Sequence, residues 1–170
     1  MNFRKAVKKD ITKLNDMYMA VIEDMQSNNI CIWDDIYPIE QIEFDVADGF
    51  MYVLENEGDI IGAFSVYDTN SASNEIEWQD NTESSAIYLG LIAVNMNNRR
   101  QGVGRLVIEE AVAIAKSRGV EYIRLLVEDR NVPAINMYTK YGFEKKRGVH
   151  KESYPDRNLF LVECGYEKRI

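Results

Sequence analysis

The segment AIYLGLIAVNMNNRRQGVGRLVIEEAVAIAKSR occupies residues 86–118 and decides how the rest of the chain is interpreted. Residues 86–94 form an apolar run typical of a strand that is buried on both faces. From residue 103 to 115, apolar side chains recur at three- and four-residue spacing, which indicates one face of a helix. Between them, residues 99–105 combine three arginines with two glycines. The order strand, glycine turn and helix predicts a place where backbone N–H groups converge.

The glycine turn itself indicates an anion site. Gly102 and Gly104 let the backbone approach a ligand closely. The first turn of the following helix adds unpaired N–H donors and the positive end of the helix dipole. Arg99, Arg100 and Arg105 favour phosphate oxygens through charge-assisted hydrogen bonds. A glycine pair taken alone is equally typical of a structural turn, so further residues must distinguish the two readings.

Two familiar phosphate-binding patterns do not fit this turn. The P-loop pattern Gly-x-x-x-x-Gly-Lys-Ser/Thr is absent from the chain. The dinucleotide fingerprint requires a third small residue where Val107 stands, and it usually lies in the first strand–helix unit rather than at mid-chain. The residues therefore favour a phosphate-bearing ligand of another kind.

The charge is distributed unevenly along the chain. Residues 1–85 hold five Lys and Arg against eighteen Asp and Glu, whereas residues 86–170 hold fifteen against ten. No Lys or Arg occurs between Lys13 and Arg99, and the net charge is −8. A nucleic-acid-binding protein would normally carry a basic footprint, so this balance argues against nucleic acid as a partner. An acidic half is most simply a solvated surface.

Length and composition predict one globular domain over residues 1–170, since 46% of the residues are hydrophobic. No apolar run approaches the roughly 20 residues needed to span a bilayer. The first residues resemble no signal peptide, which predicts a cytoplasmic protein without a membrane partner. Cys31, Cys164 and His150 are too few for a disulfide scaffold, a metal site or a His-based triad.

The remaining sequence predicts alternating strands and helices, and hence an α+β fold with one mixed sheet. A helix capped by Asp10 would carry Leu14, Tyr18 and Val21 on its buried face. Asn131 is the expected N-cap of a short helix over 133–141. The other expected elements are strands at 3–7, 50–54, 60–67, 122–127, 143–149 and 158–163, a helix at 38–48 and a surface loop at 68–83.

Two segments resemble the GNAT superfamily of N-acetyltransferases. The pattern Arg99-x-x-Gly102-x-Gly104, after a strand ending in residues 91–94, is similar to that family's acetyl-CoA signature. Residues 131–144, NVPAINMYTKYGFE, resemble its later segment, in which an Asn precedes a short helix with a Tyr and then Gly-Phe. The resemblance implies a mixed, mostly antiparallel central sheet, flanked by helices and splayed at the acetyl-CoA site.

The resemblance also implies how acetyl-CoA would be bound. The backbone of residues 92–94 would hydrogen-bond the pantetheine arm in the manner of an added strand. The backbone amides of residues 99–105 would hold the pyrophosphate, and Asn131 would contact the cofactor arm or the acceptor. The complete set of expected contacts is Ile92, Ala93, Val94, Arg99, Arg100, Gln101, Gly102, Val103, Gly104, Arg105 and Asn131.

Tyr138 is the residue that the resemblance implies as the general acid. Amine attack on a thioester expels a thiolate whose conjugate acid has a pKa of about 8.5, by analogy with cysteine. A tyrosine, with a pKa of about 10, stays protonated at neutral pH and can donate to that leaving group. Spacing alone would make Tyr138 a half-buried aromatic on a short amphipathic helix; the matching segment favours the catalytic interpretation.

The general base is left open by the sequence. The strand at 86–94 contains no carboxylate, and the neighbouring candidates are Glu77 and Glu83. A water chain to backbone carbonyls is equally compatible. A covalent acyl-enzyme would need an activated Cys or Ser. Because Cys31 and Cys164 have no histidine nearby in the sequence, we expect direct transfer instead.

The function expected from the sequence is acetyl-CoA-dependent N-acetylation of a primary amine, without a metal. The acceptor is a small-molecule amine or a peptide or protein amine, and the enzyme a monomer or homodimer. The resemblance implies that Trp33, Asp34 and Tyr37 lie near the acceptor, because the first two helices and the loop between them frame the substrate groove in relatives. A carboxylate and aromatic rings there would suit a cationic amine. The acidic half would then attract that amine. The alternative is a non-catalytic CoA-binding sensor or partner-binding module of the same fold.

Overall fold

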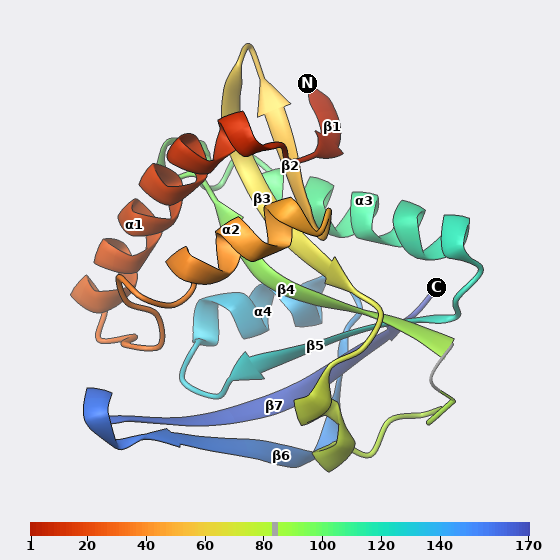
Figure 1. The fold of residues 1–170 in the computed structure, drawn as a ribbon. Coiled ribbons are helices and arrows are strands. Elements are labelled where there is room, and N and C mark those ends of the chain that lie inside the picture. The colour runs from red at the N-terminus through yellow and green to blue at the C-terminus, as the bar shows by residue number, and fades with distance from the viewer. Residues whose placement is uncertain (83–84) are drawn as a thin grey trace. The chain divides into compact units, whose positions relative to one another are not determined.

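The computed structural model describes residues 1–82 and 85–170, which form two compact units. The first unit comprises Met1–Val66 and Gly90–Glu110, and the second comprises Tyr67–Leu89 and Ala111–Ile170. The elements in chain order are β1 Asn2–Lys5, α1 Ile11–Ser27, α2 Ile39–Ala47, β2 Met51–Asn56, β3 Asp59–Tyr67, η2 Ser71–Glu75, β4 Ala86–Val94, α3 Val103–Arg118, β5 Tyr122–Glu128, α4 Val132–Lys140, β6 Glu144–Tyr154 and β7 Leu159–Arg169 (Figure 1).

The strands follow the order β1-β2-β3-β4-β5-β7-β6. The pairs β1–β2, β2–β3, β5–β7 and β6–β7 are antiparallel, and β4 and β5 are parallel. Parallel neighbours require a crossover connection, and α3 supplies it between β4 and β5. The predicted mixed, mostly antiparallel sheet with flanking helices is therefore confirmed.

In the first unit, strand β3 carries helices on both of its faces. Gly62 faces the start of α3 so closely that a Cβ at this position would lie 3.0 Å from Val103 Cγ1. Ser65 faces the other way and donates a hydrogen bond to Asp45 of α2. Successive strand residues point to opposite faces, so these contacts place α2 and the beginning of α3 on opposite sides of β3.

Helix α1 forms where its apolar spacing predicts it, but its first turn is built differently from the expectation. Asp10 was expected to accept N–H groups of the helix, and that prediction is wrong: its carboxylate makes no such capping bond. Instead Arg4 donates to both carboxylate oxygens at 2.6 and 3.0 Å, and Val7 donates its N–H at 2.8 Å. A guanidinium that donates to both oxygens forms a bidentate, charge-assisted pair, so Arg4 holds the carboxylate.

In the second unit, the 71–78 segment and α4 lie on opposite faces of the β5–β7 pair. A Cβ at Gly165 of β7 would lie 2.8 Å from Trp78 Cη2. Lys168 of β7, three residues on, instead donates to the carbonyl oxygen of Tyr141 behind α4 at 2.9 Å. The expected surface loop at 68–83 is therefore wrong for part of its length, because Ile76 and Trp78 are buried.

The two C-terminal strands are longer than the sequence predicts, each spanning eleven residues. None of the helices in the described ranges combines the length and the apolar character needed to cross a membrane.

Candidate functional site

The glycine turn places left-handed residues directly before a helix. Arg100 has φ +60° and Gly102 has φ +84°, and α3 begins at the next residue, Val103. Left-handed residues in such a turn can direct neighbouring N–H groups toward one concave point. Gln101 lies between them with its side chain exposed, and Val103 is buried. This arrangement is the one that presents backbone donors to an anion at a helix N-terminus.

Two arginines of the turn have carboxylate partners in the first unit. Arg99 Nη1 lies 2.6 Å from Asp24 Oδ2 of α1, and Arg105 Nε lies 3.6 Å from Glu109 Oε1. Exposed pairs of this kind typically contribute less than about 1 kcal/mol. A phosphate would therefore compete with these carboxylates at little cost.

The burial pattern of strand β4 changes at its midpoint. Residues before Gly90 are buried without interruption, whereas from Gly90 onward partly exposed and buried residues alternate. The pairing of β4 with β5 runs from Ala86 to Leu89. Leu91 then has φ +50°, and the hydroxyl of Tyr18 in α1 donates a hydrogen bond to its carbonyl oxygen.

The three backbone positions expected to bind the pantetheine arm follow this left-handed residue. Ile92 and Val94 are partly exposed, and Ala93 between them is buried. Sequence reasoning placed Tyr18 on a buried helix face but missed its polar role. The available signal was a tyrosine at a core position, because a buried phenol usually needs a hydrogen-bond partner.

The residues expected near the acceptor lie together in the connection between α1 and α2. The Trp33 ring packs on that of Tyr18 with centroids 5.8 Å apart. Asp34 Oδ1 accepts the N–H groups of Ile36 and Tyr37, each at 2.9 Å, and so shapes its own loop. Tyr37 is 42% exposed. Of the three side chains predicted here, Tyr37 is thus the most open to solvent.

Asn131 and Tyr138 belong to the second unit. Asn131 Oδ1 accepts the N–H of Ala134 at 3.3 Å, which confirms the predicted N-cap of α4. Tyr138 is 7% exposed, and its ring lies 5.8 Å from that of Phe143. Burial raises the pKa of the Tyr138 phenol well above its usual range. The group is therefore held in its protonated form at any physiological pH.

Glu77 and Glu83 are the two carboxylates considered for the general base. Glu77 is exposed, and its backbone N–H donates to the carbonyl oxygen of Arg147 at 2.9 Å. Glu83 lies outside the described residues.

Sequence reasoning missed a group of carboxylates around His150 in the second unit. His150 of β6 pairs across the strands with Glu163 of β7, and Glu163 pairs in turn with Glu128 of β5. His150 Nδ1 lies 2.9 Å from Glu75 Oε1, and Nε2 lies 3.8 Å from Glu152 Oε2. These residues come from four distant segments, so no local sequence pattern predicts the group.

The pKa values of His150 and Glu163 are both shifted upward. Burial lowers the pKa of His150, but the hydrogen bond and charge of Glu75, with further carboxylates nearby, raise it more, so the net shift is upward. Burial raises the pKa of Glu163, and the charges of Glu152 and Glu128 add to that effect. The positive charge of His150 acts in the opposite direction on Glu163.

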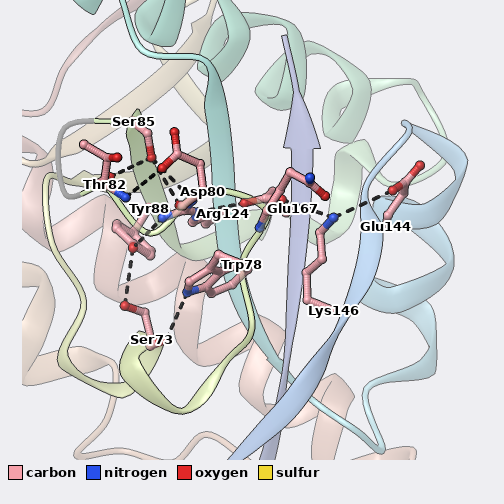
Figure 2. A network of polar contacts seen from close by, with 11 residues as sticks. Ser73, Trp78, Asp80, Thr82, Ser85, Tyr88, Arg124, Glu144, Lys146 and Glu167 are labelled. Atoms are coloured by element: carbon pink, nitrogen blue, oxygen red, sulfur yellow. Dashed lines mark hydrogen bonds and ion pairs between the residues drawn. The ribbon is translucent and has the colours of Figure 1, made fainter.

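A buried arginine lies within a network of polar contacts in the second unit, as Figure 2 shows. Arg124 of β5 is 2% exposed, and its Nε lies 2.9 Å from Glu167 Oε2 of β7. Its Nη1 donates to the Tyr88 hydroxyl at 3.1 Å, and its Nη2 donates to the carbonyl oxygen of Asp80. The guanidinium also stacks 5.0 Å from the Trp78 ring. Arg124 thus ties the 73–80 segment to three strands.

Comparison with known proteins assigns the family. The model of the acetyltransferase (GNAT) family matches residues 17–143, so the chain belongs to this family. An uncharacterized N-acetyltransferase of Methanocaldococcus jannaschii is 36% identical over 102 residues, which cover 60% of this chain and 42% of that protein. The chain therefore matches less than half of the length of that relative.

Solved structures of low sequence identity share the fold. A GNAT-family acetyltransferase of Streptococcus agalactiae superposes with a TM-score of 0.77 at 16% identity, covering 99% of this chain and 95% of that one. A Salmonella typhimurium structure solved with its cofactor acetyl-CoA gives a TM-score of 0.67 at 17% identity, covering 99% and 92%. These likenesses concern the fold alone.

Proposed function

We propose that the protein is an acetyl-CoA-dependent N-acetyltransferase that moves the acetyl group directly to a primary amine. The observation that carries the proposal is the turn before α3, where left-handed Arg100 and Gly102 precede the first helical residue. Converging N–H groups, a helix dipole and nearby guanidinium groups suit the pyrophosphate of CoA. The expected contacts along residues 92–94 would hold the pantetheine arm.

The proposed reaction is a single displacement at the thioester carbonyl. The neutral amine nitrogen attacks the carbonyl carbon, a C–N bond forms, and the C–S bond breaks. Tyr138 donates its phenolic proton to the departing sulfur, so CoA leaves as a thiol. The attacking nitrogen then carries an extra proton, which passes to a base. The phenolate left on Tyr138 takes up a proton from water. The phenol carries its proton before each turnover, as this role requires, because burial raises its pKa above the usual range.

The base that receives the amine proton stays open among Glu77, Glu83 and a water chain. Strand β4 itself offers no candidate, because residues 86–94 contain no carboxylate. Water molecules that link the amine to carboxylates or backbone carbonyls can carry its proton away. A small fraction of the amine is always neutral and able to attack.

We propose a cationic amine as the acceptor class, as a small molecule or at a peptide. The exposed ring of Tyr37 and the carboxylate of Asp34 lie in one loop of the first unit, which also contains Asp35. An aromatic face and negative charge both attract an ammonium group. The long acidic stretch without Lys or Arg adds a favourable field for such a substrate.

Two measurements test this function. Acetyl-CoA at concentrations far above its Kd should raise the melting temperature of the protein, as binding to the folded state requires. Free thiol should then be released from acetyl-CoA when cationic amines are added. Stabilisation without release by any amine would leave the alternative, a CoA-binding sensor. Absence of stabilisation would contradict the cosubstrate assignment.

A further inference from the structure

A buried phenol contacts the backbone of β4 at its left-handed residue. Tyr18 in α1 is 0% exposed, and its hydroxyl donates a hydrogen bond to the carbonyl oxygen of Leu91. Leu91 has φ +50°, a region that residues other than glycine occupy only where the surroundings hold them there. Leu91 is itself 5% exposed, so the bond lies in a dry environment, where it is strengthened.

This hydrogen bond determines which way the next peptide faces. In a trans peptide the C=O and the following N–H point in opposite directions. Because the Leu91 carbonyl points to Tyr18 in α1, the N–H of Ile92 points away from α1. A free Leu91–Ile92 peptide would have no reason to keep this orientation, since Leu91 would relax to a more common backbone conformation.

Neighbouring contacts hold both partners in place. The Trp33 ring packs at a tilt against Tyr18, which limits the movement of the phenol. Asn95, just past the end of β4, donates its N–H to the Ile61 carbonyl at 3.0 Å and its side-chain amide to that of Ile60 at 3.1 Å. The turned segment of β4 is therefore fastened to α1 at Leu91 and to β3 at Asn95.

We propose that Tyr18 is a positioning residue for acetyl transfer, whose hydroxyl fixes the Leu91–Ile92 peptide so that the Ile92 N–H is aimed at the acyl oxygen of the thioester. The inference rests on the proposed function, which assigns the backbone of Ile92 to the cosubstrate. Negative charge develops on the acyl oxygen during attack, and a fixed donor aimed at it stabilises the transition state more than the ground state.

The test is the variant Tyr18→Phe, which removes only the hydroxyl and keeps the ring against Trp33. With a productive amine, kcat should fall about 10- to 100-fold, while the KM for acetyl-CoA changes less than about threefold. Tyr52→Phe is the matched control, because Tyr52 is also a buried tyrosine of the first unit, stacked on Phe64. A purely structural role for Tyr18 would lower the melting temperature but leave kcat per folded molecule unchanged, which would overturn the proposal.

A second variant and a second readout keep the test decisive. If Tyr18→Phe does not fold, 4-aminophenylalanine at position 18 restores a donor at the same place and should recover kcat to within about threefold of the unmodified enzyme. In the protein without substrate, Tyr18→Phe should shift the Leu91 carbonyl ¹³C and Ile92 amide ¹⁵N resonances. Unchanged resonances would refute the positioning role even if no acceptor is found, whereas failure of the unmodified enzyme to release thiol would count against the proposed function alone.

Discussion

Gly62 in β3 lies against Val103, the first residue of α3, so closely that a Cβ at position 62 would stand 3.0 Å from Val103 Cγ1 and 3.6 Å from Val107 Cγ2. The same imaginary atom would lie 3.5 Å from the carbonyl oxygen of Ala93 in β4. The position where the helix begins, and hence the turn before it, is therefore set by the absence of a side chain on the neighbouring strand.

The variant Gly62→Val should displace the start of α3 and weaken acetyl-CoA binding. Overpacking of this kind typically costs about 1–3 kcal/mol of stability, and the N–H groups of the turn would lose their alignment. We expect the Kd for acetyl-CoA, measured by calorimetry, to rise about tenfold or more. Gly58→Ala is the control for lost stability alone, because φ +89° at Gly58 strains any side chain while a Cβ there meets nothing within 4 Å. A Gly62→Val protein that binds acetyl-CoA as tightly as the control would show that the turn does not depend on this packing.

The pair Arg99–Asp24 predicts a competition with phosphate. Asp24→Asn removes a negative charge 2.6 Å from Arg99 Nη1 and releases that guanidinium for the cosubstrate. We expect the Kd for acetyl-CoA to fall about two- to fivefold at low salt, and the difference to shrink in high salt as screening increases. Glu23→Gln, an exposed neighbour in the same helix, removes the same charge without freeing Arg99. Equal changes of the Kd in both variants would mean that the lost negative charge, and not the release of Arg99, changes acetyl-CoA binding.

His150 predicts how stability varies with pH. Its pKa is raised in the folded protein, with Glu75 as its hydrogen-bonded partner and Glu152 and Glu163 nearby. The stabilisation by protonated His150 is therefore fully present below about pH 6.5, the pKa of the unfolded chain, and is lost as the pH rises through the folded pKa.

Thermal unfolding of the unmodified protein and of Glu75→Gln at a series of pH values measures this contribution. The Glu75→Gln variant should be less stable than the unmodified protein at pH 6, and the gap should narrow by pH 8.5. A gap of constant size across that range would mean that the pair contributes no proton-linked stability.

Replacing the buried Arg124 should strongly lower the stability of the protein. Arg124→Met would leave the carboxylate of Glu167, itself 2% exposed, with Lys146 at 3.1 Å as its remaining cationic partner. Breaking a buried ion pair from one side costs about 3–5 kcal/mol, which corresponds to a loss of roughly 6–20 °C in melting temperature. Arg118→Met removes an exposed arginine paired with Asp68 and should cost less than about 1 kcal/mol. Similar losses in both variants would contradict the central role of Arg124.

Much of the fold follows from local sequence patterns. The apolar run at 86–94 and the spacing along α1 and α3 predict these elements to within a residue or two, since burial and periodicity act locally. The cap by Asn131 follows from local backbone chemistry in the same way. These local patterns do not give the order in which the strands pair in the sheet. The family resemblance supplies that order.

The misplaced features depend on contacts between distant residues. Trp78 is buried because Gly165, nearly ninety positions away, leaves room for its ring, and no pattern within 68–83 records that partner. Asp10 is a different case: it binds Arg4, which lies only six positions earlier in the chain, instead of capping its helix. The hydrogen bond from Tyr18 to Leu91 joins α1 to β4, so the sequence alone could show only an unexplained tyrosine in a buried stripe.

The release of CoA thiol from acetyl-CoA, measured over a panel of cationic, neutral and anionic amines, tests acetyl transfer most directly. The account predicts release with cationic amines and a kcat about 10²- to 10⁴-fold lower in Tyr138→Phe, with acetyl-CoA affinity unchanged. Tyr141→Phe, at the end of the same helix, should retain full turnover. Thiol release that no amine stimulates, or turnover in Tyr138→Phe equal to that of Tyr141→Phe, would contradict the account.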